Sequence, residues 1–357
     1  MEDLGIAPQA IEDLEIVLGR RLVSCYSCAR LTRLRRLRIK VTKDVDVEAG
    51  DGGYWAALAL GAWPDECEVE LVAGSRLALV LPRDIQQRVT TLSLHNTMFR
   101  DHEAYWFSGV RTAVFRKVNG DLNACDLARV LPLVASLTFD DCPHTSSFAF
   151  LSGFAFLEAL TVANTRSELL VSVPEGVKCK VTSLKLEYLC NEPKSLLDWP
   201  ALLELQTSGS MPRMRTDTLR ALRLDAATVP VPALHFASLE SLTLTAVGRT
   251  FGSCFRATAT GLRHLRLALF KEDAALRDFM RVQTRLVTLH LSWIEQGEGS
   301  DEGLGAHLVP ATVRELSCMA LKAADAPRLR DTLEILTVRH DAQRLRRLLP
   351  HTLIKEL

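Results

Sequence analysis

Few residues in this chain have the types and spacing that chemistry requires. The candidates are the pair Cys25 and Cys28, the pair His264 and His290, and the acidic pairs Asp140–Asp141 and Asp301–Glu302. A structural zinc site needs four ligands, and no second pair follows Cys28 at zinc-finger spacing. His264 and His290 fall at equivalent places in adjacent segments, which could bring them close together, but they lack a third ligand. We therefore expect no metal site.

Motifs of the common enzyme classes are also missing from the sequence. The chain has no G-x-x-x-x-G-K-[ST], no G-x-G-x-x-G, no H-E-x-x-H and no G-x-S-x-G. Such motifs cradle phosphates, bind cofactors or metals, or present a nucleophile. We expect a protein that is not an enzyme and that has no cofactor and no small-molecule substrate.

Basic residues are densest between Arg30 and Lys43. This run contains Arg30, Arg33, Arg35, Arg36, Arg38, Lys40 and Lys43. It could contact RNA or act as a nuclear signal. Leu31, Leu34, Leu37 and Ile39 interrupt it at regular spacing, however, which favours the interpretation that its charges are the solvated side of a strand. Both interpretations remain open at this stage.

A leucine pattern recurs along the whole chain and decides the architecture. Its clearest copies are Leu219-Leu222-Leu224, Leu239-Leu242-Leu244, Leu262-Leu265-Leu267 and Leu286-Leu289-Leu291. The central residues of successive copies are Leu92, Ala113, Leu137, Leu160, Leu184, Leu205, Leu222, Leu242, Leu265, Leu289, Leu316 and Leu336, preceded by Leu37 and a weaker copy at Val69. Alternation within each copy predicts a short strand, and the repetition predicts a solenoid of about fourteen units.

This pattern resembles the leucine-rich repeat family, whose consensus is L-x-x-L-x-L-x-x-N/C-x-L. The family's Asn or Cys position is kept at Cys142 but replaced by Thr165, Leu189 or Ala227 in other copies, so the chain resembles a divergent member. The resemblance implies an α/β solenoid: a curved horseshoe with a parallel β-sheet on its concave side and irregular or short-helical segments on its convex side.

The solenoid is predicted over residues 31–357, preceded by an N-terminal helical cap within residues 1–30. Ile11, Leu14, Val17, Leu18 and Leu22 fall at helical spacing and predict a capping helix over 8–22. Insertions near 41–60 and 295–306 break the period and should project as loops. Tyr54 and Trp55, in the first insertion, could anchor a partner.

The residues between the leucines of each strand should face outward and offer a binding surface. The partner-binding candidates are Arg36, Arg38, Lys40, Glu68, Glu70, His264, Arg266 and His290, together with Tyr54 and Trp55. The surface mixes both charges with Ser and Thr. A nucleic-acid groove would instead show a continuous basic stripe with aromatic residues between the charges.

Composition narrows the function further. Lys plus Arg (43) equals Asp plus Glu (43), which gives no bulk attraction to nucleic acid or anionic lipid. No apolar run is long enough to cross a bilayer, the first residues lack the layout of a signal peptide, and the nine cysteines are scattered. We expect an intracellular protein, cytoplasmic or nuclear, that is neither secreted nor bound to a membrane.

The leading hypothesis is a non-catalytic scaffold for protein–protein interaction, one subunit of an intracellular assembly. The first alternative is a subunit of a ribonucleoprotein complex that contacts RNA through Arg30–Lys43. The second alternative is a substrate receptor of a ubiquitin ligase, for which the N-terminal segment would have to bind an adaptor.

Overall fold

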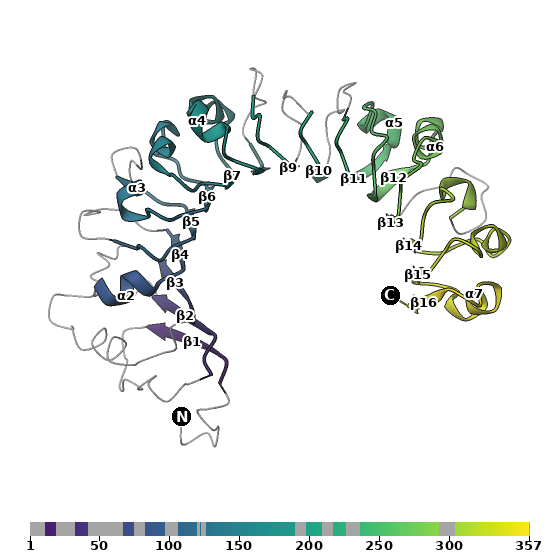
Figure 1. The fold of residues 1–357 in the computed structure, drawn as a ribbon, viewed down its shortest axis with the longest axis horizontal. Coiled ribbons are helices and arrows are strands. Elements are labelled where there is room, and N and C mark those ends of the chain that lie inside the picture. Colours follow the sequence, from purple (N-terminus) through teal and green to yellow (C-terminus); the bar gives the residue numbers. More distant parts are fainter. Residues whose placement is uncertain are drawn as a thin grey trace. The chain divides into compact units, whose positions relative to one another are not determined.

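The computed structural model describes residues 11–18, 33–41, 67–74, 83–96, 106–119, 122, 126–189, 198–208, 217–225, 236–292 and 304–356. The chain divides into two compact units. Unit 1 comprises residues 1–181 with 189–191, and unit 2 comprises residues 182–188 with 192–357. In each unit, short strands lie along one side and turns and short helices along the other (Figure 1).

Seven of the described strands belong to unit 1. They are β1 (Asp13–Leu18), β2 (Arg36–Val41), β3 (Glu68–Gly74), β4 (Thr91–His95), β5 (Thr112–Arg116), β6 (Ser136–Asp140) and β7 (Ala159–Ala163). The return segments contain α2 (Arg83–Arg88), α3 (Leu127–Val130), α4 (Glu175–Lys178) and the 3-10 helices η5 (Ala149–Gly153) and η6 (Ser167–Ser172).

Nine of the described strands belong to unit 2. They are β8 (Ser183–Glu187), β9 (Glu204–Ser208), β10 (Ala221–Asp225), β11 (Ser241–Thr250), β12 (His264–Lys271), β13 (Thr288–Ser292), β14 (Glu315–Cys318), β15 (Ile335–Val338) and β16 (Leu353–Glu356). The return segments contain α5 (Phe251–Cys254), α6 (Ala274–Arg281), α7 (Ala342–Leu348) and the 3-10 helices η7 (Ala306–Leu308) and η8 (Ala326–Leu329).

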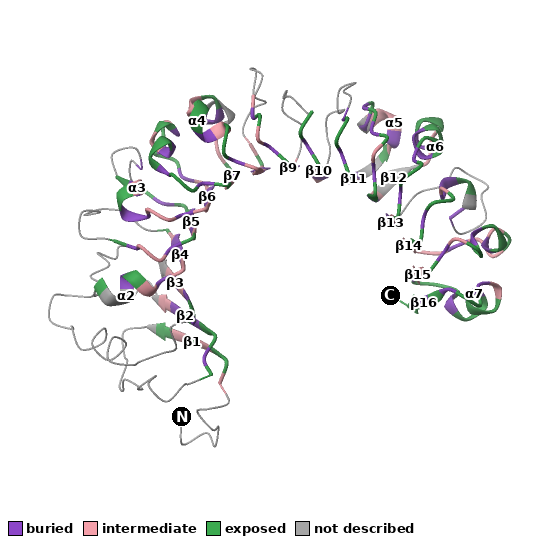
Figure 2. Cartoon of the chain, viewed as in Figure 1, coloured by how far each residue is buried: buried purple, intermediate pink, exposed green. Residues whose placement is uncertain are grey.

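Within each unit, every strand pairs in parallel with its neighbours in the chain. Leu242 of β11 lies opposite Leu222 of β10 and Leu265 of β12, and the same alignment continues to Leu289 and Leu316. These leucines are buried, and the residues on either side of them in the strand are partly or fully exposed (Figure 2). The predicted solenoid of stacked parallel strands is therefore confirmed in each unit.

The predicted N-terminal capping helix is wrong where the structure describes it. Residues 13–18 form β1, which pairs in parallel with β2 from Asp13↔Arg36 to Leu18↔Val41. Alternation at Leu14, Ile16 and Leu18 satisfies a strand as well as a helix, and such a short apolar run leaves the two indistinguishable by periodicity. Pairing with β2 settles the choice, so the described stack of strands already includes residues 13–18, ahead of residue 31.

One step of the predicted register is also shifted. Ile39 lies opposite Leu71, and Leu71 in turn lies opposite Leu92. The residue equivalent to Leu92 is therefore Leu71 rather than Val69. A shift of two residues keeps every side chain on the same face of the sheet, because side chains alternate with period two. Thr90 accommodates the shift: its hydroxyl accepts a hydrogen bond from the Val69 amide (3.1 Å) and donates one to the Val69 carbonyl (3.2 Å).

Stacked aromatic side chains fill the space between the strands and the return segments. In unit 1, Phe115 and Phe139 stack with ring centroids 5.5 Å apart, and Phe148 lies 5.3 Å from Phe139. In unit 2, Phe251 and Phe279 join α5 to α6 at 5.0 Å. Each fully buried Phe or Leu contributes about 1.5–3 kcal/mol, but only when the next repeat covers it.

Left-handed residues end four successive strands of unit 1. Asn96, Lys117, Asp141 and Asn164 have φ between 49° and 52° and follow β4, β5, β6 and β7 directly. The amides of the first three donate to carbonyls at the end of the next strand, those of Arg116, Asp140 and Ala163, at 2.8–3.1 Å. After Asp141, the Cys142 thiol donates a hydrogen bond to the Phe115 carbonyl at 3.3 Å. Cys142 occupies the family's Asn/Cys position, so its side chain satisfies a backbone carbonyl of the preceding repeat.

The first prediction tests the register of the leucines. Leu289→Asp places a charge without a partner in the core and should lower the free energy of unfolding by about 4 kcal/mol or more, measured by urea denaturation. Thr288→Asp, the adjacent outward position on the same strand, should change that free energy by less than about 1 kcal/mol. Equal losses in the two variants would contradict the register.

The second prediction tests the left-handed turns. Lys117 adopts φ 51° without the tolerance that Asn has for this conformation. Its ion pair with Asp141, at 3.9 Å between exposed groups, contributes little. Lys117→Asn should therefore raise the free energy of unfolding by about 0.5–1 kcal/mol. The reciprocal change Asn96→Lys should lower it by a similar amount; a gain in both variants would show that the conformation is not the cause.

Candidate functional site

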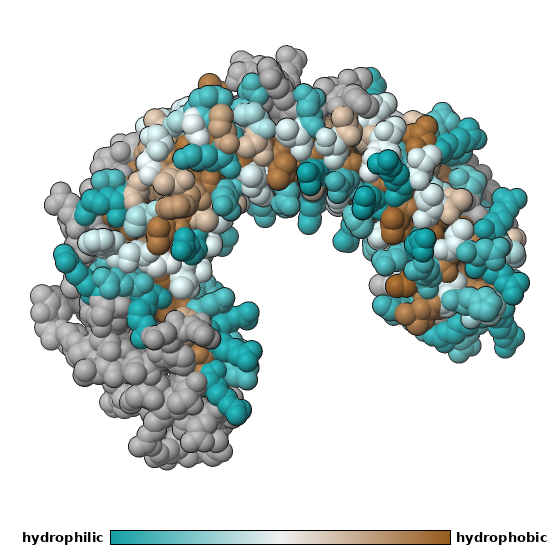
Figure 3. Space-filling view, in the orientation of Figure 1, coloured by the Kyte–Doolittle hydropathy of each residue, from teal (hydrophilic) through white to brown (hydrophobic). Residues whose placement is uncertain are grey.

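The candidate binding surface consists of the outward residues of the strands. Along β6, β8 and β13, partly exposed residues alternate with buried ones, so each repeat presents two or three side chains away from the core. Hydrophilic side chains accordingly project from the strand side of the N-terminal repeats of unit 1 (Figure 3). Adjacent strands lie about 4.8 Å apart, which sets the spacing of this surface along the stack.

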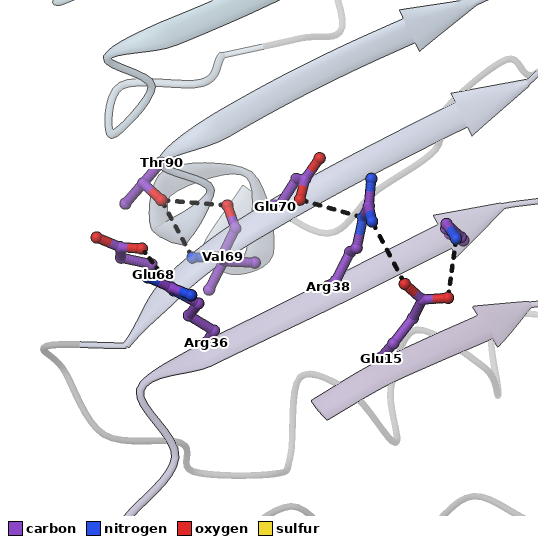
Figure 4. Close-up of polar contacts among 8 residues, drawn as sticks. Glu15, Arg36, Arg38, Glu68, Val69, Glu70 and Thr90 are labelled. Atoms are coloured by element: carbon purple, nitrogen blue, oxygen red, sulfur yellow. Dashed lines mark hydrogen bonds and ion pairs between the residues drawn. The ribbon is translucent and has the colours of Figure 1, made fainter. Parts of the chain in front are cut away.

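The basic residues predicted on β2 are paired with carboxylates of β1 and β3. Arg38 lies between Glu15 (3.5 Å) and Glu70 (3.1 Å), as Figure 4 shows. Lys40 approaches Glu15 at 2.9 Å, and Arg36 approaches Glu68 at 3.5 Å. The strand register places Glu15, Arg38 and Glu70 opposite one another, so the pairs form a continuous ladder.

The ladder lowers the pKa of the Glu15 carboxyl. The largest cause is the hydrogen bond from Lys40; desolvation, the second largest, opposes it, and the charges of Lys40 and Arg38 lower the pKa further. Sequence reasoning missed Glu15 because it assigned residues 8–22 to a helix. The alternation of Leu14, Ile16 and Leu18 was the signal that could have placed Glu15 on a strand beside Arg38.

An open hollow of about 570 Å³ lies over the ladder. Its lining includes the charged residues Asp13, Glu15, Arg36, Arg38, Glu68 and Glu70, with Thr90 and Thr91 at the start of β4. Both signs of charge and two hydroxyls face the same space. Such a surface can form ion pairs with either positive or negative groups of a partner. Among the residues that line it, none is a nucleophile with an adjacent base, as nucleophilic catalysis would require.

A second polar group lies at the ends of β5–β7 in unit 1. The Asp140 carboxylate accepts hydrogen bonds from Arg116 Nε (2.6 Å) and Asn164 Nδ2 (2.7 Å). Burial is the main cause that lowers the pKa of nearby His95, and the charge of Arg116 lowers it further. The sequence identified Asp140 only as a member of the acidic pair Asp140–Asp141; its partners come from the neighbouring repeats, about 24 residues away.

The histidines of unit 2 are not at equivalent positions, contrary to the prediction. His264 of β12 lies opposite Thr288, and His290 of β13 lies opposite Arg266. The difference is two residues, which keeps both side chains on the outward face but offsets them along it. His290 Nε2 is 2.7 Å from the Ser292 hydroxyl. Burial lowers the pKa of His290, and the charge of Arg266 lowers it further.

Other predicted features lie outside the described residues. They are Tyr54 and Trp55, the pair Cys25 and Cys28, and almost all of the two insertions. Within the described ranges, no group of three or more His, Cys, Asp or Glu side chains could hold a metal ion. Among the described helices, none has the length and apolar character that spanning a membrane requires.

Comparison with known proteins gives structural matches alone. No protein-family model and no curated protein matches the chain. A solved structure of the Toll–Spatzle complex from Drosophila matches with a TM-score of 0.52 and 13% identity, over 93% of this chain and 51% of that chain. The mouse RP105/MD-1 complex matches with a TM-score of 0.45 and 14% identity, over 91% and 55%.

The chain thus spans about half the length of the two structures it resembles. At 13% identity the likeness to Toll, a leucine-rich repeat protein, concerns the fold alone. It agrees with the parallel strands, the buried leucines and the short return helices of both units. The chain therefore has the leucine-rich repeat fold, in a divergent form.

Proposed function

We propose that this protein is a non-catalytic scaffold that binds a protein partner through the outward residues of its strands. The observation that carries the proposal is the ladder on β1–β3. Its exposed cations and carboxylates alternate within 2.9–3.5 Å of one another, on a face with no catalytic grouping among the described residues. Protein interfaces match such mixed charge patterns, because complementary potentials give specificity.

The same ladder argues against the alternative that Arg36, Arg38 and Lys40 bind RNA. Each of these cations already has a carboxylate within 4 Å, so a phosphate would have to displace that carboxylate and would also be repelled by it. The complex of Toll with Spatzle offers a parallel, since Toll has the same fold and associates with another protein. No observation favours a ubiquitin-ligase receptor.

We further propose that the protein acts inside the cell as a subunit of a larger assembly. Cys142, Cys179 and Cys318 are free thiols, and two of them are buried. Burial raises the pKa of the Cys142 thiol and raises that of Cys318 to about 12. Buried thiols of this kind are unreactive and serve as packing residues. Cysteines that remain thiols are typical of proteins in a reducing compartment, which supports a location inside the cell.

The third prediction tests the ladder as an interface. The tagged protein should recover stoichiometric protein partners from its own cells, with and without nuclease, as measured by quantitative mass spectrometry. The most abundant partner is then purified. Arg38→Gln should raise the dissociation constant of its complex with the protein about tenfold, because the substitution removes a charge from the centre of the ladder. Raising the salt concentration should have a modest effect, in contrast to the steep dependence of a phosphate contact.

Arg129→Gln provides the matched control. Arg129 is likewise an exposed, ion-paired arginine of unit 1, but it lies on α3 and pairs with Asp126 at 3.7 Å. Its substitution should leave partner binding unchanged. Partners that disappear on nuclease treatment, or equal losses from the two substitutions, would overturn the proposal.

A further inference from the structure

One row of outward side chains crosses the nine described strands of unit 2. Its members lie opposite one another in the strand register: Lys185, Gln206, Arg223, Thr243, Arg266, His290, Ser317, Thr337 and Lys355. We name this set the basic row. It contains four Lys or Arg residues and a histidine, with no carboxylate in any of its nine positions.

The corresponding row of unit 1 is different. Directly after the buried residues Leu92, Ala113, Leu137 and Leu160, it contains Ser93, Val114, Thr138 and Thr161, which are all uncharged. Its cation on β2, Lys40, is paired with Glu15. Both rows therefore lack carboxylates, and the basic row of unit 2 differs from the row of unit 1 in its larger number of cations.

Among the described residues, the cations of the basic row that have no ion-pair partner are Arg266 and, at the last strand, Lys355. Lys185 pairs with Glu187 at 2.9 Å, and Arg223 pairs with Asp225 at 2.8 Å. Arg266 is exposed, and no carboxylate in the described part of unit 2 lies within ion-pair distance of it. Its neighbours across the strands, Thr243 and His290, are uncharged near neutral pH and can donate hydrogen bonds.

We propose that the basic row binds an extended, acidic segment of a partner protein, with a carboxylate seated at Arg266. A guanidinium flanked by hydroxyl and imidazole donors suits a carboxylate. Strand spacing adds a length: Arg266 and Lys355 lie four strands apart, about 19 Å, which matches acidic residues six positions apart in an extended chain. The inference rests on the proposed function and names the chemistry of the partner.

Proton uptake should accompany this binding. The groups nearest His290 are Arg266 of β12, Ser292 of β13 and Ser317 of β14; Glu315 of β14 lies opposite Thr288, in a different row. In the free protein, burial and the charge of Arg266 keep His290 neutral. A carboxylate at Arg266 opposes that charge and favours protonated His290, so the affinity should rise as the pH falls below 7.

The fourth prediction uses a defined probe. A fluorescent peptide with glutamates at every third position, separated by serines, should bind the full chain in an anisotropy titration. Arg266→Gln should weaken binding at least about tenfold, while Arg330→Gln, an exposed arginine of unit 2 at the end of η8, should leave it unchanged. The same peptide with lysines should not bind.

The fifth prediction concerns pH. Affinity for the glutamate peptide should increase by up to about tenfold per pH unit between pH 7.5 and 5.5, and His290→Gln should abolish this increase while preserving the thermal melting curve. A pH dependence that survives His290→Gln would exclude His290 as the group that takes up the proton.

Three outcomes distinguish this inference from the proposed function and from nucleic-acid binding. If the natural partner binds but the glutamate peptide does not, or Arg266→Gln affects neither, the basic row is not the docking site and the scaffold function stands. If a single-stranded oligonucleotide binds more tightly than the peptide and competes with it, the row recognises nucleic acid and the inference is overturned. If the peptide binds at Arg266 but native cells contain no stoichiometric protein partner, the scaffold function itself fails.

Discussion

The stacking of one repeat's leucines on those of the next is the interaction on which this structure depends. A single repeat buries too little apolar surface to fold, so each strand exists because its neighbours cover it. Parallel register then fixes everything on the outward face: a slip of one residue would exchange Leu289 for His290 on the core side. The shift of two residues between β3 and β4 is tolerated because it preserves this alternation, and Thr90 completes the hydrogen bonds there.

The turns at the strand ends add a second constraint. Where a longer side chain such as Lys117 follows the strand, the chain still adopts the left-handed conformation, because its amide must reach the carbonyl of Asp140 on the next strand. Backbone hydrogen bonding therefore overrides local preference. This also explains how the fold persists although the family's Asn is lost. The backbone amides at the strand ends and the Cys142 thiol donate to carbonyls that would otherwise accept a hydrogen bond from the Asn side chain.

The leucine spacing was sufficient to predict strands, core and outward positions, because burial imposes a strict period. It was insufficient at β1, where six residues satisfy two periods and only pairing with β2 decides between them. The sequence also failed to predict which charged side chains pair with one another. The partners of Arg38 and Asp140 lie one repeat away, and a sequence shows such neighbours only when the register is known to the residue. The prediction that His264 and His290 occupy equivalent positions was wrong for the same reason.

Register also explains why a chain with equal numbers of acids and bases can carry two different surfaces. Arg38 and Arg266 both follow a buried leucine on a strand, but Arg38 faces Glu15 and Glu70, whereas Arg266 faces Thr243 and His290. A carboxylate approaching Arg38 meets two like charges, and one approaching Arg266 meets none. The charge that each surface offers to an approaching carboxylate therefore depends on the placement of acids in the neighbouring repeats more than on the number of cations.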